Sequence, residues 1–362
     1  MSPPIGITAT NISSAFQLRI GCVPEHFSSP IYQIIDSGVF PNAVIVFHFL
    51  LYFVLIIAIK VNCPGGTGQM IQYLKEDKID IAFALTEGLI ANLVNDLIKR
   101  KRVDEGLTRI SFDSDEAKSD NMENEFKIIG TYVSRPLTWS IASHINLKKE
   151  GEDNFDKFSG YETIKNWKIG VSRFGSGSHI IPFVLADSMG WLDDGQKIPF
   201  EFVVLNNING LINGIKENKC DTFLWERFTT KPYYDENIVH HLSNITPPWP
   251  AFTIAATDKI LLTKLSLVKD FLRVLNTQTT KFDQNKADNV EFIKDSFSLK
   301  EKDVLNWLNT VEYQKDIFSV DFEVFKSCFN ILKKSKVILN GDNLNFEDVV
   351  GDVIFNETKL IY

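Results

Sequence analysis

The chain has 362 residues, of which 44% are hydrophobic and 23% are charged, and its formal net charge is −8. These values are ordinary for a soluble globular protein with a real core, and the length suggests roughly two domains. The acidic balance argues against nucleic acid and anionic membrane surfaces as main partners, because both require clustered cations.

The four cysteines are far apart and show no CxxC spacing, so we expect no structural metal site. Scattered thiols fit a reducing compartment. The first 21 residues lack the basic and apolar regions of a signal peptide. We therefore expect a cytoplasmic protein.

Apolar runs alternate with amphipathic runs along most of the chain. In chain order, the predicted strands cover 17–23, 79–85, 127–133, 137–143, 167–172, 200–205, 220–226 and 251–257. The predicted helices cover 29–40, 68–78, 86–102, 177–191 and 208–219, and residues from 259 onward are mostly helical. This alternation is typical of an α/β protein with largely parallel sheets.

A near-repeat suggests two similar halves. Residues 71–84 and 212–225 align without gaps, and each reads as a helix, a tight polar turn and a strand that ends in a polar loop. Convergent chemistry of the turn would give the same pattern, but two similarly built lobes explain it better.

Two segments depart from the alternation. Residues 100–125 are polar and of mixed charge, which indicates an exposed insertion. Residues 43–59 are apolar apart from His48. This second segment is longer than a typical buried strand and lies at the short limit for a membrane span.

Three interpretations of 43–59 stay open. In the first, the end near IIAIKVN is a strand and the rest is a hydrophobic segment outside the sheet. In the second, the segment is a membrane span. In the third, it is translated from an intron or a wrong gene model. A spanning helix would separate the first strand from the rest of its lobe, which argues against the second interpretation.

Two glycine-rich turns, which we call corners, have a similar pattern of residues. CPGGTG supplies Gly65, Gly66, Thr67 and Gly68, and RFGSGSH supplies Arg173, Gly175, Ser176, Gly177 and Ser178. Each follows a strand and opens a helix, so free backbone N–H groups and the helix dipole favour an anion or a polar oxygen there. Neither corner is a P-loop or a GxGxxG motif, and a plain tight turn is the alternative.

Six motifs in order carry a resemblance: VPEHF (23–27), PGGTG (64–68), LTEG (85–88), GTYVSRPLTW (130–139), GVSRFGSGSH (170–179) and LWERFTTKPY (224–233). Over residues 16–280 the chain resembles the type 2 periplasmic-binding-protein family, in particular a fungal, cytoplasmic-looking branch. That branch is similar to bacterial solute-binding proteins for nitrate, sulfonates and thiamine precursors, and distantly similar to thiamine-pyrimidine synthases.

The resemblance implies an α/β fold of two lobes with two crossing segments, near 134–138 and 246–250, and a helical C-terminus. Lobe 1 would begin with residues 16–134, lobe 2 would comprise 135–247, and 248–362 would return to lobe 1 and add C-terminal helices. Ligand would lie between the lobes, at the carboxyl ends of the strands.

The resemblance also places further residues at the cleft. His26 could donate to a ligand, Glu87 could accept from a ring amine, and the tryptophans, or Phe174, could stack on a flat ligand. Alternatively, Glu87 could cap the following helix, and the aromatic residues could pack in the core. The ligand-binding candidates outside the two corners are His26, Phe27, Thr86, Glu87, Thr138, Trp139, Trp225, Glu226, Thr229 and Trp249.

These features favour a binding protein for a small anionic or heteroaromatic metabolite, without a cofactor, metal or catalytic residues. The related synthases carry a cysteine cluster and a lysine that holds pyridoxal phosphate, and this chain has no such cluster. An enzyme of thiamine-pyrimidine precursor synthesis is one alternative, and a membrane-anchored solute receptor is another. The sequence does not indicate an oligomeric state.

Overall fold

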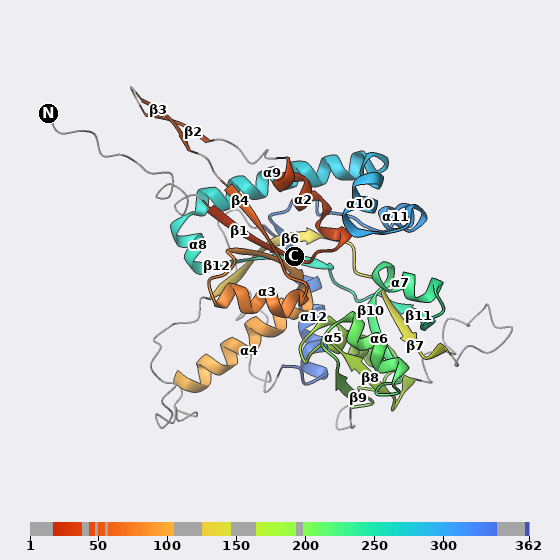
Figure 1. The fold of residues 1–362 in the computed structure, drawn as a ribbon. Helices are drawn as coiled ribbons and strands as arrows, with labels where there is room; N and C mark the ends of the chain where they lie inside the picture. Colours follow the sequence, from red (N-terminus) through yellow and green to blue (C-terminus); the bar gives the residue numbers. More distant parts are fainter. Residues whose placement is uncertain are drawn as a thin grey trace, which may run out of the picture.

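The structure is a computed structural model, and two five-stranded sheets form its framework (Figure 1). It describes residues 17–37, 43–47, 50–54, 57–104, 125–145, 164–192, 198–338 and 359–361. The first sheet has the order β4-β1-β5-β12-β6. Its strands are β1 (Gln17–Cys22), β4 (Ile57–Asn62), β5 (Ile81–Leu85), β6 (Phe126–Val133) and β12 (Phe252–Thr257).

The second sheet has the order β11-β7-β10-β8-β9. Its strands are β7 (Trp139–Ser143), β8 (Lys168–Val171), β9 (Glu201–Val204), β10 (Thr222–Glu226) and β11 (His240–Ile245). The chain passes from the first sheet to the second between β6 and β7, and it returns between β11 and β12. The predicted α/β architecture of two lobes with two crossing segments is therefore confirmed, whereas the predicted lobe boundaries stay a prediction.

The prediction of largely parallel sheets holds for four of the five strands of each sheet, and the remaining strand of each sheet runs the other way. In the first sheet β12 is antiparallel to both β5 and β6, and in the second β7 is antiparallel to both β10 and β11. The crossings are the physical reason. A strand that receives the chain from the other lobe starts at the edge where its neighbours end, so β7 and β12 run against them.

Helices cover the sheets, and their apolar spacing explains why they form. In α9 (Leu265–Gln284) the buried side chains include Val268, Leu272 and Leu275, which recur every three or four residues along one face. The other helices of this lobe and of the C-terminal part are α2 (Ser29–Asp36), α3 (Gly66–Lys75), α4 (Thr86–Asp104), α8 (Asp258–Thr263), α10 (Val290–Phe297), α11 (Glu301–Leu308) and α12 (Phe322–Lys334). The second lobe has α5 (Gly177–Ser188), α6 (Ile208–Lys216) and α7 (Arg227–Asp235).

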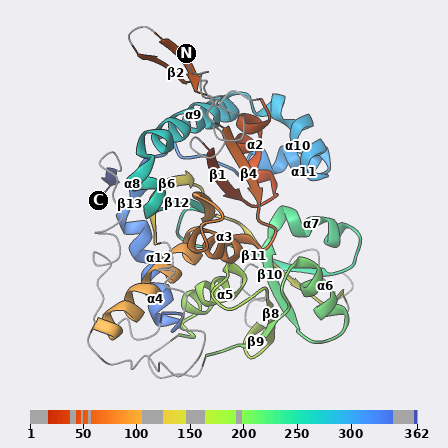
Figure 2. The same cartoon turned by 60° about the vertical axis from the view of Figure 1, so that its left-hand side comes forward.

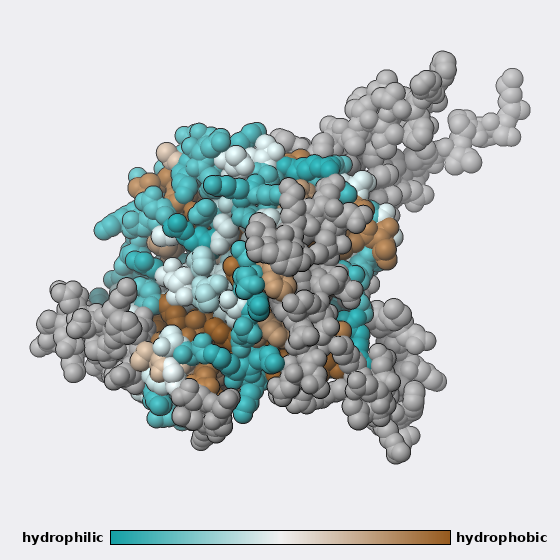
Figure 3. Space-filling model, turned by 180° about the vertical axis from the view of Figure 1, so that it is seen from behind, coloured by the Kyte–Doolittle hydropathy of each residue, from teal (hydrophilic) through white to brown (hydrophobic). Residues whose placement is uncertain are grey.

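A single buried apolar cluster includes residues of both sheets, such as Ile20 and Ile169, and a smaller one lies within the second lobe around Phe223. The views in Figures 1 and 2 place α2 and α9 on one side of the first sheet and α3 and α4 on the other. Hydrophilic residues cover much of the described surface seen from behind, with hydrophobic side chains gathered below its middle (Figure 3).

The described parts of the apolar segment 43–59 form strands. β2 (Ala43–Phe47) and β3 (Leu50–Val54) pair with each other as a separate antiparallel hairpin, which lies away from the first sheet (Figures 1 and 2). β4 then pairs in parallel with β1 along all six of its residues. The interpretation that the strand lies at the IIAIKVN end is confirmed. Within the described part of the chain, no helix is long and apolar enough to cross a membrane. The gene-model interpretation stays untested.

Three further differences concern local structure. Residues 100–104 belong to α4, so the predicted insertion 100–125 begins later than expected, and residues 105–124 lie outside the described residues. The predicted polar loop after β10 is instead the start of α7. A strand that the sequence does not predict, β11, completes the second sheet, and short strands β13 (Ser319–Asp321) and β14 (Lys359–Ile361) pair in parallel.

Candidate functional site

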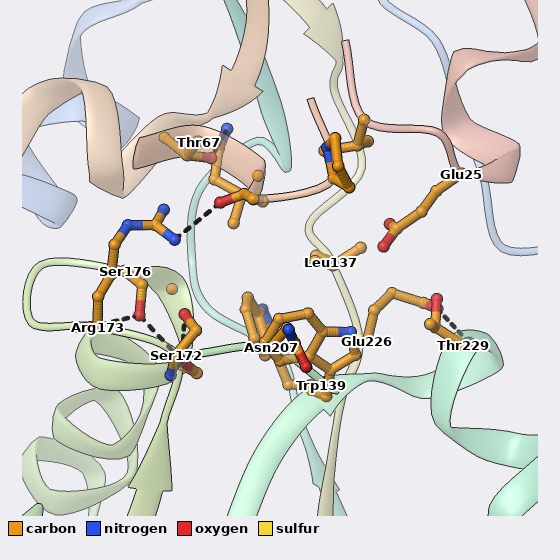
Figure 4. A pocket seen from close by; sticks show the side chains of 18 of the residues that line it. Glu25, Thr67, Leu137, Trp139, Ser172, Arg173, Ser176, Asn207, Glu226 and Thr229 are labelled. Atoms are coloured by element: carbon orange, nitrogen blue, oxygen red, sulfur yellow. Dashed lines mark hydrogen bonds between the residues drawn. The ribbon is translucent and has the colours of Figure 1, made fainter. Parts of the chain in front are cut away.

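A pocket of about 260 Å³ lies between the lobes, where strands of both sheets end (Figure 4). Val23 follows β1 and Ser172 follows β8, while Glu226 is the last residue of β10. Strands of both lobes thus direct their carboxyl ends at one gap, the usual place for a ligand in open α/β sheets. The predicted residues that line it are Gly65, Gly66, Thr67, Trp139, Arg173, Ser176, Gly177, Ser178, Trp225, Glu226 and Thr229.

The first glycine corner supplies the N-terminus of α3. Gly66 has a φ of +66°, a left-handed conformation that glycine adopts without strain. The hydroxyl of Thr67 accepts a 3.0 Å hydrogen bond from the backbone N–H of Leu85, so it ties the corner to the end of β5. The first N–H groups of a helix have no partner within it, and here they lie beside the pocket.

The second corner supplies the N-terminus of α5 and a chain of hydroxyl groups. Ser176 donates through Oγ to the carbonyl oxygen of Arg173 at 2.7 Å, and its Oγ lies 2.9 Å from that of Ser178. The Oγ of Ser178 accepts from the backbone N–H of Ser172 at 3.0 Å. These bonds hold the hydroxyl groups in fixed positions at the pocket wall, close to the positive end of the α5 dipole.

Arg173 joins the two corners. Its Nη1 donates a 2.8 Å hydrogen bond across the gap to the carbonyl oxygen of Gly65. The side chain passes so close to α3 that a Cβ atom at Gly68 would lie 2.0 Å from Arg173 Nε. Burial lowers the pKa of this guanidinium, a sign that it lies in surroundings poor in water. A cation beside two helix N-termini makes this end of the pocket strongly receptive to an anion.

Two glutamates lie at the opposite end (Figure 4). Glu226 is only 4% exposed, and its Oε2 accepts from the backbone N–H of Thr229 at 2.7 Å and from the Thr229 hydroxyl at 2.9 Å. Glu25 extends toward the pocket from the loop after β1. Burial raises the pKa of Glu25 to about 8, with a smaller contribution from the charge of Glu226, and burial also raises the pKa of Glu226 to about 7.

Aromatic and apolar side chains form the wall between the two ends. Trp139 is almost fully buried, and its indole N–H has no partner among the described residues. Trp225, Leu137 and Phe252 add apolar surface. A flat or aliphatic middle part of a ligand would fit such a wall.

Eight predicted residues do not line the pocket and lie close to it: His26, Phe27, Gly68, Thr86, Glu87, Thr138, Gly175 and Trp249. Their predicted contact with a ligand stays a prediction, and several of them have packing roles in the structure. Glu87 accepts from the indole Nε1 of Trp249 at 3.0 Å, and Thr86 donates to the carbonyl oxygen of Pro250. Both bonds fasten the start of α4 to the second crossing segment.

The aromatic candidates outside the pocket have other neighbours. Phe27 packs on Phe252 and Trp307, with ring centroids 5.2 and 5.4 Å apart. Phe174 is 64% exposed and contacts the ring of His179 at 5.1 Å. Neither ring lines the pocket in this structure.

The pocket also contains residues that the sequence analysis does not select: Val23, Pro24, Glu25, Pro64, Leu85, Leu137, Ser172, Asn206, Asn207 and Phe252. Most of them follow or end a predicted strand. Since ligands bind at the carboxyl ends of strands, every residue at such an end is a candidate, and this signal could have found Glu25 and Asn206.

Two α/β lobes around a pocket at the strand ends define the architecture of solute-binding proteins. Residues 139–245 match the family model described as Ca3427-like PBP. The chain is similar to the Candida albicans CA3427 gene product, which is described as having the generic periplasmic binding protein fold. The two are 24% identical, over 95% of this chain and 96% of that one, with a TM-score of 0.68.

Two bacterial structures extend this similarity. The alkanesulfonate-binding protein SsuA from Xanthomonas axonopodis pv. citri, bound to MOPS, is 13% identical over 89% of this chain and 94% of that one, with a TM-score of 0.62. The periplasmic nitrate-binding protein NrtA from Synechocystis is 12% identical over 94% and 88%, with a TM-score of 0.55. Among curated proteins, none matches this chain. The chain therefore has the periplasmic-binding-protein fold that its motifs predict.

Proposed function

We propose that this protein binds a small anionic metabolite in the pocket between its lobes and does not convert it chemically. The observation that carries the proposal is the arrangement at one end of the pocket. There the guanidinium of Arg173, the N-termini of α3 and α5, and the hydroxyl groups of Ser176 and Ser178 face one gap. Each of these groups favours negative charge or an acceptor oxygen.

The hydrogen bonds of the serines support binding rather than nucleophilic catalysis. Ser172, Ser176 and Ser178 bond to one another and to backbone groups. Within the described residues, no hydrogen bond joins any of their hydroxyl groups to the ring of a histidine that could act as a base. The solute-binding neighbours for alkanesulfonate and nitrate favour the same class of ligand.

Isothermal titration calorimetry with nitrate, sulfate and a series of alkanesulfonates tests the proposal on the full chain. We expect at least one of these anions to bind. The Arg173→Ala variant should bind it about tenfold to a hundredfold more weakly, because a charged hydrogen bond contributes about 1.5–3 kcal/mol. Arg273→Ala is the matched control, since Arg273 is an exposed arginine that pairs with Asp270 on α9. Equal affinities for both variants would remove Arg173 from the site.

Native mass spectrometry of the protein as purified addresses the identity of the ligand. A co-purified anion that Arg173→Ala loses and Arg273→Ala retains would support the proposal. A cofactor of the kind that enzymes use, such as pyridoxal phosphate, would support catalysis instead.

A further inference from the structure

The two ends of the pocket have opposite electrostatic character. Arg173, Ser172 and Ser176 lie at one end, and the carboxyl groups of Glu25 and Glu226 lie at the other (Figure 4). A purely anionic ligand would use the first end and leave the second without a role.

Among the described residues, no lysine or arginine forms an ion pair with either carboxyl group at the second end, and only the more distant charge of Arg227 acts on Glu226. The structure shows no hydrogen bond or ion pair from another described residue to the Glu25 carboxylate. Glu226 accepts bonds from Thr229, a neutral partner. Neighbouring Arg227 lies over the ring of Phe228, with its guanidinium carbon 5.6 Å from the ring centroid. When two buried carboxyl groups lie near each other, the negative charge of one makes ionisation of the other less favourable. A cation between them would offset this effect.

A buried histidine lies beside this end without lining the pocket. His26 is only 2% exposed and is held by aromatic rings, with the ring centroids of Phe27 and Trp307 each 4.6 Å away. Its Nε2 has no hydrogen-bond partner and lies 3.9 Å from Glu226 Oε2. Burial lowers the pKa of His26 to about 3, so the ring is neutral and cannot act as the missing cation.

We infer that the natural ligand is dipolar: it carries a protonated amine, or another nitrogen group that donates hydrogen bonds, at the end opposite its anionic group. The nitrogen would lie between Glu25 and Glu226, and the apolar wall around Trp139 would hold the part that separates the two charges. The inference rests on the proposed function for the anionic end. The raised pKa values of both glutamates agree with it, because burial disfavours their charged forms and a cation beside them would stabilise those forms.

Three sets of probes that share one skeleton test the inference by calorimetry: ethane-, propane- and butanesulfonate, their terminal amino derivatives, and the corresponding alkylammonium ions. In the unmodified protein, we expect the best amino derivative to bind about tenfold to a hundredfold more tightly than the matched alkanesulfonate. The Glu25→Gln variant should lose most of this preference and keep its affinity for the alkanesulfonate. Glu25 suits the test because its side chain forms no hydrogen bond with another described residue, whereas the side chain of Glu226 caps α7.

Glu217→Gln, at an exposed turn where Glu217 pairs with Lys219, is the matched control and should keep the preference. Alkanesulfonates that bind as tightly as their amino derivatives, in both the unmodified protein and Glu25→Gln, would overturn the inference and leave the proposed function intact. Binding of alkylammonium ions alone, or of none of the probes to folded protein, would overturn the anion site and this inference together.

Discussion

Arg173 Nη1 lies 2.8 Å from the carbonyl oxygen of Gly65, so a side chain of the second lobe is bonded to the backbone of the first. The two residues belong to the two glycine-rich corners, which are more than a hundred residues apart in the chain. The bond therefore ties the two lobes together beside the pocket.

The Gly68→Ala variant tests whether the position of Arg173 matters, separately from its charge. A methyl group at residue 68 would lie 2.0 Å from Arg173 Nε and must displace the guanidinium. Stability should stay equal or rise by up to about 1 kcal/mol, because alanine favours a helix more than glycine does. Affinity for the anion should fall about tenfold. Urea denaturation and calorimetry measure the two effects, and unchanged affinity would show that Arg173 can bind from elsewhere.

A second contact between the lobes involves ion pairs. Lys231 of α7 lies 3.2 Å from Asp303 of α11, and Lys300 lies 2.9 Å from Asp235. Asp303 is 3% exposed, so Lys231→Met would leave a buried carboxylate without its partner. We expect this change to lower the free energy of unfolding by about 3 kcal/mol. Lys300 is exposed, and Lys300→Met should cost less than about 1 kcal/mol. Equal losses in urea denaturation would contradict this ranking.

The strands that carry the pocket were predictable because buried strands are continuous apolar runs between turns. β11 is an exception. In HHLSNI only Leu242 is buried, so its pairing with β7 holds it in the sheet and local preference does not. The directions of β7 and β12 were also beyond prediction from apolar patterns, since they follow from the crossings between the lobes.

The site was predictable at its glycine corners and less so elsewhere. Glycines and serines at the start of a helix reveal a binding corner through their residue types alone. Glu25 and His26 are neighbours in a loop without periodicity, and the pattern cannot tell that Glu25 lines the pocket while His26 is packed among aromatic rings. Glu226 combines two roles, because it both lines the pocket and caps α7.

The hairpin of β2 and β3 should be dispensable for the fold. It pairs only with itself among the described strands, while β4 pairs with β1 independently. Replacing residues 43–54 by a short glycine-serine linker should therefore preserve the circular dichroism spectrum and the affinity for the anion. The apolar composition of the segment also predicts better solubility without it. A replaced variant that fails to fold would show that the hairpin supports β4.

The stability of the protein measured without added ligand should depend on pH through the buried carboxyl groups. Burial raises the pKa of Glu25 to about 8 and that of Glu226 and Glu87 to about 7, above the value of about 4.3 in an unfolded chain. Between these values the folded state binds more protons, so the free energy of unfolding falls as pH rises. His26 and His179, whose pKa values burial lowers, act in the opposite sense only below about pH 6.5.

The free energy of unfolding should therefore fall most clearly between about pH 6.5 and about pH 8. Three other groups that face the two pocket glutamates stay neutral in this range, because burial raises the pKa values of Tyr32 and Tyr234 and lowers the pKa of His26 to about 3. Glu25→Gln should make the free energy of unfolding depend less on pH. The effect is at most about 1.4 kcal/mol for each unit of pKa shift that the change removes, and it should be smaller than this limit because Glu25 is partly exposed to the pocket. Thermal unfolding across this range measures the slope, with the exposed Glu217→Gln as control. A melting temperature that stays constant in the unmodified protein would mean that Glu25 and its neighbours are already ionised at the lower pH.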